Sequence, residues 1–373
     1  MLLSDICEII MGQSPSSDSY NVKGQGLPFF QGNADFGKLY PSVRLWCNCP
    51  IKKAEAGDLL VSVRAPIGAV NLANQKCCIG RGLAALRPYR DKCDAMYLYY
   101  LIKAGKNKLN WLGTGSTFKA ITRSSLLSFN VPDYCIAFQR KISGKLWSVD
   151  KLIHQRNEQL KLFDLLIQSR FLEMFGMSEG IDKHLEDVAD ICSGITKGRK
   201  VLGLELREVP YMAVSNVKMG YIDLSTVKTI MATENEIEQY RLFPNDILMT
   251  EGGDPDKVGR GAIIRNPPKD CIHQNHIFRV RLHKDVLLPE FFEEYLQGNS
   301  ARRYFLKAAK QTTGIASINM KQLRALPVKI PPIKVQIQYS DFVHQVDKSK
   351  LAVQKSLDEL ETLKKSLMQI YFG

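Results

Sequence analysis

Side chains that donate and accept hydrogen bonds recur in loops of both halves of the chain, interspersed with Lys and Arg. Lys and Arg neutralise phosphates, and Arg, Asn, Gln, Ser and Thr also reach the edges of bases. The first half offers Gln13, Ser14, Gln31, Asn33, Arg64, Arg81, Thr114, Ser116, Thr117 and Lys119. The second half offers Thr196, Lys197, Arg199, Lys200, Asn216, Lys218, Lys257, Arg260, Gln274, Asn275, His276, Lys310, Thr312 and Thr313. Each one alone is equally compatible with an ordinary solvated loop, so the prediction of nucleic-acid contact rests on their recurrence at matching positions.

Two segments approach catalytic motifs without completing them. Residues 266–269 nearly match the Asn-Pro-Pro-aromatic sequence of amino-methyltransferases, but Lys269 replaces the aromatic ring and no Gly-rich nucleotide loop follows an upstream strand. Residues 251–257 hold enough acids for a nuclease metal site, but no suitably spaced acid and lysine follow Asp256. The matching first-half loop, residues 63–68, has no acids. We interpret both segments as loops between strands and expect no catalytic residues, no metal site and no cofactor.

The nine cysteines are scattered, which favours reduced thiols over a disulfide framework. Cys47 and Cys49, with Cys77 and Cys78, are the one group that could bind zinc. Neither pair has the ligand spacing that is typical of structural zinc sites. We therefore favour buried thiols in strands.

The charge balance indicates a polyanionic partner. The chain carries 51 basic and 38 acidic residues, a net charge of +13. Residues 1–176 hold 23 basic and 13 acidic residues, a balance of +10, and the remainder holds 28 and 25, a balance of +3. A sustained positive field attracts nucleic acid, although an ordinary solvated surface could also carry this excess. No stretch is long and apolar enough to span a bilayer, and the acidic N-terminal segment is unlike a signal peptide, so we expect a cytoplasmic protein.

Two segments 197 positions apart share a heptad pattern of apolar residues. Residues 149–176 and 346–373 each open with Val-Asp-Lys and close with Phe-Gly. Basic residues interrupt the two stripes at Arg156, Arg170, Lys350 and Lys364. About 33 helical residues form a rod about 50 Å long, which is longer than a small domain is wide. We therefore expect the two helices to cover each other, although each could instead pack on its own domain.

The duplication extends into the rest of the chain. Residues 3–12 match 185–194, residues 57–60 match 245–248, and Gly115 precedes Pro132 by the same spacing as Gly314 precedes Pro331. Short apolar runs at 59–63, 247–250 and 277–282 predict buried strands, whereas 96–104 and 289–297 predict helices and 310–314 a polar loop. The expected fold class is therefore mixed α/β (α+β). We expect two globules, 1–135 and 183–332, a central long helix at 136–176, a linker at 177–182 and a C-terminal long helix at 333–373.

In this order and in duplicate, the features resemble the specificity subunit of type I restriction-modification systems. The resemblance rests on the Leu-x-Asp-Ile/Val start, the Gly/Asn-Asp-Leu/Ile-Leu strands, the Gly-to-Pro spacing and the paired helices that end in Phe-Gly. It implies a non-catalytic subunit with two pseudo-twofold-related target-recognition domains joined by two long antiparallel helices in a coiled coil. It also implies double-stranded DNA and two methyltransferase (modification) subunits as partners. A restriction subunit, an ATP-dependent endonuclease, is a further partner that the resemblance leaves open.

Each domain would then read half of a bipartite DNA site, with half-site centres about one helical turn, or about 34 Å, apart. The loops at 64–68 and 251–259 differ, so we expect an asymmetric target. Two alternatives stay open: a self-contained DNA methyltransferase or nuclease, and a coiled-coil scaffold without DNA function. Basic interruptions in a helical seam suit a defined register or an outside partner. We therefore hypothesise that Arg156, Arg170, Lys350 and Lys364 face or border the methyltransferase subunits.

Overall fold

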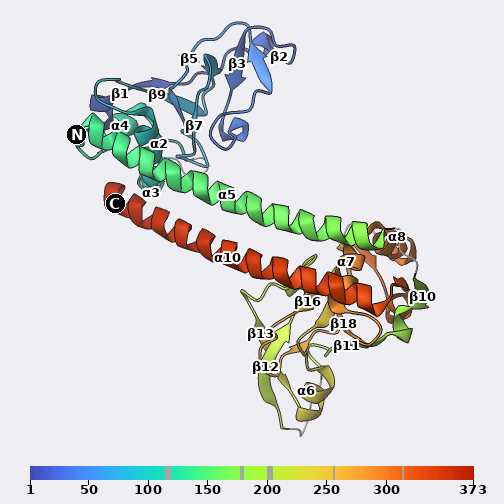
Figure 1. Cartoon of the computed structure of the whole chain (residues 1–373). Helices are drawn as coiled ribbons and strands as arrows, with labels where there is room; N and C mark the ends of the chain where they lie inside the picture. The colour runs from blue at the N-terminus through green and yellow to red at the C-terminus, as the bar shows by residue number, and fades with distance from the viewer. Residues whose placement is uncertain (114–118, 177–179, 200–204, 255–256, 313–314) are drawn as a thin grey trace. The chain divides into compact units, whose positions relative to one another are not determined.

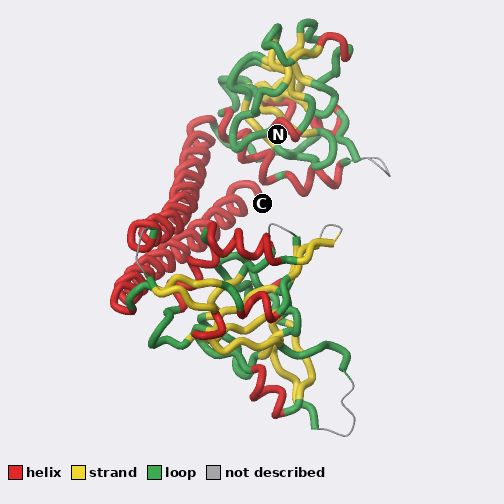
Figure 2. The backbone as a smooth tube through the Cα atoms, turned by 90° about the vertical axis from the view of Figure 1, so that its right-hand side faces the viewer, coloured by secondary structure: helices red, strands yellow, loops and turns green. Residues whose placement is uncertain are grey.

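The computed structural model describes residues 1–113, 119–176, 180–199, 205–254, 257–312 and 315–373. It divides into two compact units, one of Met1–Glu158 with Gln354–Gly373 and one of Gln159–Val353. Each unit therefore combines one globule with a piece of each long helix. Figure 2 shows the strands grouped within each globule, with loops and short helices around them.

The first globule is built on two sheets. An antiparallel sheet has the order β1-β9-β6-β7, and a second sheet has the order β2-β4-β3-β8-β5. The strands are β1 (Cys7–Met11), β2 (Tyr20–Asn21), β3 (Leu27–Phe30), β4 (Leu45–Cys47), β5 (Lys53–Ala54), β6 (Leu59–Ser62), β7 (Val70–Leu72), β8 (Cys77–Ile79) and β9 (Leu83–Pro88). The helices are α1 (Leu3–Ile6), α2 (Ala95–Ala104), α3 (Lys106–Leu112) and α4 (Arg123–Leu127), with 3-10 turns η1 (Ser17–Ser19) and η2 (Asn33–Asp35).

The second globule repeats this plan with additions. Its central sheet has the order β11-β18-β14-β16, and smaller sheets have the orders β13-β12-β17, β15-β20-β19 and β10-β21. The strands are β10 (Ile181–His184), β11 (Ala189–Ser193), β12 (Arg207–Met212), β13 (Lys228–Ala232), β14 (Asp246–Thr250), β15 (Gly252–Gly253), β16 (Gly261–Ile264), β17 (Ile272–His273), β18 (Ile277–Leu282), β19 (Lys310–Thr312), β20 (Ile315–Ser317) and β21 (Pro327–Ile330). The helices are α6 (Glu234–Tyr240), α7 (Pro289–Gln297), α8 (Asn299–Ala308) and α9 (Met320–Arg324), with η3 (Leu185–Asp187) and η4 (Val214–Asn216).

The central sheets of the two globules have matching registers. Leu59 of β6 lies opposite Leu86 of β9, and Ile247 of β14 lies opposite Val280 of β18. Every residue of β6 and β14 is buried, as expected for a strand covered on both faces. The sequence repeat is therefore a structural repeat, and each position of one central strand has a defined equivalent in the other. One expectation was wrong, because residues 310–312 of the predicted polar loop form strand β19.

An aspartate at the start of each central strand explains the repeated Gly/Asn-Asp pair. Asp58 receives two hydrogen bonds from Arg87, at 3.1 and 2.8 Å, and Asp246 receives two from Arg281, both at 2.8 Å. Both carboxylates are buried and accept a backbone N–H as well. The preceding residue has a positive φ in both copies, 93° at Gly57 and 75° at Asn245, which Gly and Asn adopt most readily.

The two long helices, α5 (Ile136–Phe175) and α10 (Ile333–Phe372), each run for 40 residues without a break (Figure 1). Their segments are antiparallel in each unit. In the first unit the end of α10 lies beside the start of α5, with Lys364 paired to Asp150. In the second unit Lys350 lies 2.6 Å from Asp164. The start of α5 also packs into its own globule through apolar side chains, so both packing arrangements that the sequence allows occur together.

A buried glutamine fastens each long helix to its globule. Gln139 accepts the Asp94 N–H at 3.1 Å and donates to the carbonyl oxygens of Lys92 and Tyr134 at 2.9 and 2.8 Å. Gln336, 197 positions later, makes the same three bonds with Leu288, Val286 and Pro331 at 2.9, 3.0 and 2.8 Å. Each side chain is almost inaccessible to solvent. The angle between helix and globule is thus held by hydrogen bonds that cannot exchange with water.

Candidate nucleic-acid interface

Four of the predicted residues line one polar recess in the first globule. Gln31, Asn33, Arg64 and Arg81 surround a hollow of about 210 Å³. Its remaining walls are Gly32, Ser62, Ala65 and Gly82. The recess lies where the loops after β3, β6 and β8 meet, and Gln31, Arg64 and Arg81 are exposed. Two guanidinium groups and two amides therefore converge from segments that are far apart in the sequence.

Backbone hydrogen bonds hold these loops together. Ser14 Oγ accepts the Arg81 N–H at 3.2 Å, and the Gln13 N–H donates to the Ile79 carbonyl at 3.0 Å. A Cβ at Gly82 would lie 2.4 Å from the Gln31 carbonyl oxygen, so only glycine allows this close approach. The loop that carries Gln13 and Ser14 thus lies directly beside the recess.

The loop before α4 reaches the same region. Arg64 forms an isolated bridge with Ala120, which places exposed Lys119 one residue away from that bridge. The predicted residues Thr114, Ser116 and Thr117 lie outside the described residues. The described part of this predicted set is therefore gathered on one side of the first globule.

In the second globule the equivalent loops also meet. The Ile195 N–H donates to the His273 carbonyl at 2.8 Å, and the Asn275 N–H donates back to Ile195 at 3.0 Å. Thr196 and Lys197 follow directly and are exposed. Gln274 and Asn275 are half-buried, and His276 is exposed. These side chains occupy the positions that Ser14, Arg81 and their neighbours hold in the first globule.

Two predicted residues have structural roles instead. Asn216 is buried, and its amide accepts the Ala213 N–H and donates to the carbonyl oxygens of Asp223 and Thr226. Arg199 makes two 2.5 Å hydrogen bonds with Glu236. Because these groups are already paired within the fold, we remove both from the predicted contact set. Asp35 is the counterpart of Asn216 in the first globule, where it accepts the Gln31 and Gly32 N–H groups and pairs with Arg44.

The other predicted residues of this globule are less gathered. Lys310 is exposed at the start of β19, Lys218 and Arg260 are half-buried, and Lys257 pairs with Asp254. Thr312 lies in β19, but its side chain is outside the described part of the structure. Lys200 and Thr313 also lie outside the described residues.

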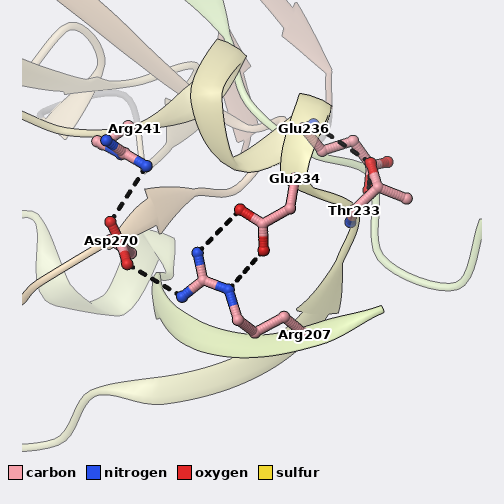
Figure 3. A network of polar contacts seen from close by, with 6 residues as sticks. All are labelled: Arg207, Thr233, Glu234, Glu236, Arg241 and Asp270. Atoms are coloured by element: carbon pink, nitrogen blue, oxygen red, sulfur yellow. Dashed lines mark hydrogen bonds and ion pairs between the residues drawn. The ribbon is translucent and has the colours of Figure 1, made fainter. Parts of the chain in front are cut away.

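A separate charge network lies at the edge of the second globule (Figure 3). Arg207 donates to Glu234 at 2.6 and 3.1 Å and to Asp270 at 3.0 Å, and Arg241 lies 3.2 Å from Asp270. The hydrogen bonds from Arg207 hold the pKa of Glu234 and of Asp270 below their ordinary values. The paired charges link β12, α6 and the loop before β17, so we assign this network to the fold.

Basic residues of the helical seam also have partners within the fold. Lys350 and Lys364 bind carboxylates on the opposite helix, and Arg170 donates to Glu173 at 2.7 Å and lies 5.8 Å from the ring centre of Phe342. Arg156 is half-buried on α5. The helix pair therefore uses the charges of Lys350 and Lys364 itself, and the hypothesis that the four side chains face or border the methyltransferase subunits stays a prediction.

Among the described residues, no three His, Cys, Asp or Glu side chains gather as metal ligands would. His273 is fully buried, and burial lowers its pKa to about 4. Its ring is therefore neutral at physiological pH. Within the same residues, no helix combines the length and apolar character needed to cross a bilayer.

Comparison with known proteins identifies the family. A model of the type I restriction modification DNA specificity domain matches residues 1–162 and 179–362. The chain belongs to this family. The family's putative MjaX specificity subunit from Methanocaldococcus jannaschii is 44% identical over 152 residues, which cover 41% of this chain and 36% of that protein. This chain thus matches little more than a third of the MjaX relative's length.

Two further family members match the whole chain. The MjaIX specificity subunit of the same organism is 21% identical over 405 aligned positions, which cover 100% of this chain and 92% of that protein. The crystal structure of a type I restriction-modification S subunit from M. genitalium has 15% identity, a TM-score of 0.59, and covers 100% of this chain and 95% of its own. The fold of this chain is therefore that of an S subunit.

Proposed function

We propose that the protein is the DNA specificity subunit of a type I restriction-modification complex, without cutting or methylating activity of its own. The observation that carries this proposal is the polar recess formed by Gln31, Asn33, Arg64 and Arg81, with an equivalent loop surface in the second globule. Arg and amide side chains at one place suit base edges and phosphates. Each globule, residues 1–135 and 183–332, is then a target-recognition domain, and the cytoplasm is the expected location because the genomic DNA lies there.

The helices support a spacer between the two domains. The pairs Asp150 with Lys364 and Asp164 with Lys350 are displaced by 14 positions on each helix, so both units use the same antiparallel register. We propose that this register continues between the units as one coiled coil with pseudo-twofold symmetry. Half-sites on one face of the duplex would then lie about one helical turn, ~34 Å, apart. The remaining outer face of the coil would dock two methyltransferase subunits.

The test is modification of DNA in a host that lacks the system. The methyltransferase subunits are expressed with and without this chain, and the modified bases are located by sequencing. We expect a bipartite, asymmetric motif only when the chain is present. Methyl transfer by the purified chain alone, or a symmetric palindrome as its target, would contradict the proposal.

A domain-specific variant sharpens the test. Replacing Arg64 and Arg81 by Ala removes two recess charges without touching the second globule. We expect the sequence preference of one half-site to weaken while the other half-site stays unchanged. A scaffold without a DNA function would show no such half-site effect.

A further inference from the structure

Glu251 and His276 form a hydrogen-bonded pair at the end of the central sheet of the second globule. His276 Nδ1 lies 2.6 Å from Glu251 Oε2. The His276 side chain is 58% exposed and that of Glu251 34%. Glu251 follows β14, and His276 follows Gln274 and Asn275 of the candidate interface. A ligand at that interface can therefore reach both side chains.

Matching backbone bonds identify the counterparts of this pair in the first globule. The Val63 N–H donates to the Gly82 carbonyl at 3.0 Å, and the Glu251 N–H donates to the His276 carbonyl at 3.0 Å. The carbonyl oxygens of Val63 and Glu251 each accept a 2.8 Å bond from the isoleucine that precedes the N-cap of α4 or α9. Glu251 therefore stands at the position of Val63, and His276 at that of Gly82, which lines the polar recess.

The fold does not require an acid at this position. Val63 is apolar and only 3% exposed, yet its strand end has the same backbone bonds as that of Glu251. A carboxylate that faces DNA is repelled by the phosphates. His276 engages Oε2, and the other carboxylate oxygen, Oε1, can accept a hydrogen bond from a donor on the ligand. The connection beside this position also differs between the globules. Two residues, 31 and 32, separate β3 from η2 in the first globule, whereas Ala213 alone separates β12 from η4 in the second. The shorter connection thus occurs in the globule that has a side chain, His276, in place of Gly82.

We propose that the Glu251–His276 pair determines which base the second globule recognises, with the Glu251 carboxylate accepting a hydrogen bond from an exocyclic amino group in the major groove. Cytosine N4 and adenine N6 present such a group there, and a carboxylate is the usual partner of cytosine. His276 holds the carboxylate in place through Nδ1. The first globule has no acid at the equivalent position, so it cannot make this contact. The inference rests on the proposed DNA-reading function.

The test uses the full chain with Glu251→Gln, expressed with the methyltransferase subunits, and the modified motif is read by sequencing. An amide keeps the size of the side chain but adds a donor where the base also donates. If the base is cytosine, we expect the preference at one position of one half-site to fall about tenfold, with a gain for adenine. If the base is adenine, the amide also pairs with it, and only removal of the side chain relaxes that position. The identity of the affected base distinguishes cytosine from adenine. The other half-site should stay unchanged.

Two further variants make the result decisive. Glu208→Gln alters an exposed acid on β12 that accepts a hydrogen bond from Thr229, and it should leave the motif intact. The double variant Glu251→Val with His276→Gly installs the residues of the first globule and should relax the same position for either base. An unchanged motif in both Glu251 variants, whatever the number of modified sites, would show that the pair does not read a base and would overturn the inference. A wild-type chain that yields no bipartite motif would instead contradict the proposed function, and the inference with it.

Discussion

Asp58 and Asp246 each accept bidentate hydrogen bonds from an arginine on the neighbouring strand, which fasten the central strand of each globule. The carboxylates are almost fully buried, whereas the side chains of Arg87 and Arg281 are about one-third exposed, at 35% and 33%. Loss of one member of such a pair leaves a charge without its partner in a poorly solvated place. We therefore assign these residues to stability and not to the proposed DNA contact, which involves the recess.

We expect Asp58→Asn to lower the free energy of unfolding by about 3 kcal/mol, because Arg87 loses its buried carboxylate. Urea denaturation of the full chain measures this loss. Glu8→Gln is the matched control, since Glu8 binds the same arginine at 3.4 Å but is half exposed. The control should cost less than about 1 kcal/mol. Equal losses of unfolding free energy in both variants would show that burial of the carboxylate does not determine how much an ion pair with Arg87 stabilises the fold.

At the scale of elements, the structure depends on how each long helix is attached to its globule. The glutamine at the first helical turn binds three backbone groups of the globule in both copies. Farther along the helices, Asp164 of α5 forms an ion pair with Lys350 of α10. Glu294 of α7 interacts electrostatically with both Asp164 and Lys350.

Gln336→Leu should destabilise the second unit by about 3 kcal/mol, because the Leu288 N–H and two carbonyl oxygens lose their buried partner. Thermal unfolding followed by circular dichroism measures the effect. Gln345→Leu, at an exposed position of the same helix, should change stability by less than about 0.5 kcal/mol. An unchanged Tm in Gln336→Leu would contradict this expectation.

Burial raises the pKa of Glu294 to about 7, and the carboxylates of Glu293 and Asp164 add to the rise, whereas Lys350 opposes it. Below the ordinary pKa of about 4.5 both folded and unfolded chains are protonated here. Between about 4.5 and 7 the unfolded chain ionises first, so this group lowers stability as pH rises. Glu294→Gln should therefore raise stability at pH 8 by roughly 1–2 kcal/mol, after allowance for partial exposure, and by little at pH 4.5.

Urea unfolding at the two pH values measures this difference. Glu238→Gln, which replaces an exposed acid of α6 in the same globule, serves as the control and should show no such pH dependence. A gain of equal size at both pH values would argue against the titration of Glu294 as the cause.

At the scale of the whole molecule, the excess positive charge lies mainly in the first 176 residues, with +10 of the total +13. Binding to duplex DNA should weaken steeply with salt, because each neutralised phosphate releases condensed counterions. We expect the second part of the chain, with its smaller net charge of +3, to contribute less to non-specific affinity and to depend more on directed hydrogen bonds. The uneven charge thus fits two half-sites that are read in different ways.

We expect the slope of log K against log salt concentration to fall in magnitude by about 2 when Arg64 and Arg81 are both replaced by Ala. Fluorescence anisotropy with a labelled duplex at several salt concentrations measures the slope. Arg90→Ala, at the other end of β9, removes an exposed charge far from the recess along the strand and should leave the slope unchanged. An unchanged slope in the double variant would place the DNA elsewhere on this globule.

The sequence by itself determined the duplication, the buried central strands and the two long helices, because each depends on local periodicity or on residues repeated at matching positions. The runs predicted at 277–282 and 289–297 have the same bounds as β18 and α7. Such features follow from the spacing of apolar side chains along one segment.

Tertiary structure alone decided which polar side chains are available for recognition. Asn216 and Arg199 have the same residue types as Asn33 and Arg81, but their polar groups are already hydrogen-bonded within the fold. The partners of Asn216 are backbone groups of Ala213, Asp223 and Thr226, and the partner of Arg199 is Glu236, 37 positions away. Lys350 and Lys364 likewise meet acids on the opposite helix. The pairing of Glu251 with His276 also requires two loops 25 positions apart to meet. Whether a polar group is available to DNA depends on these partners, which only the folded chain brings into hydrogen-bonding distance.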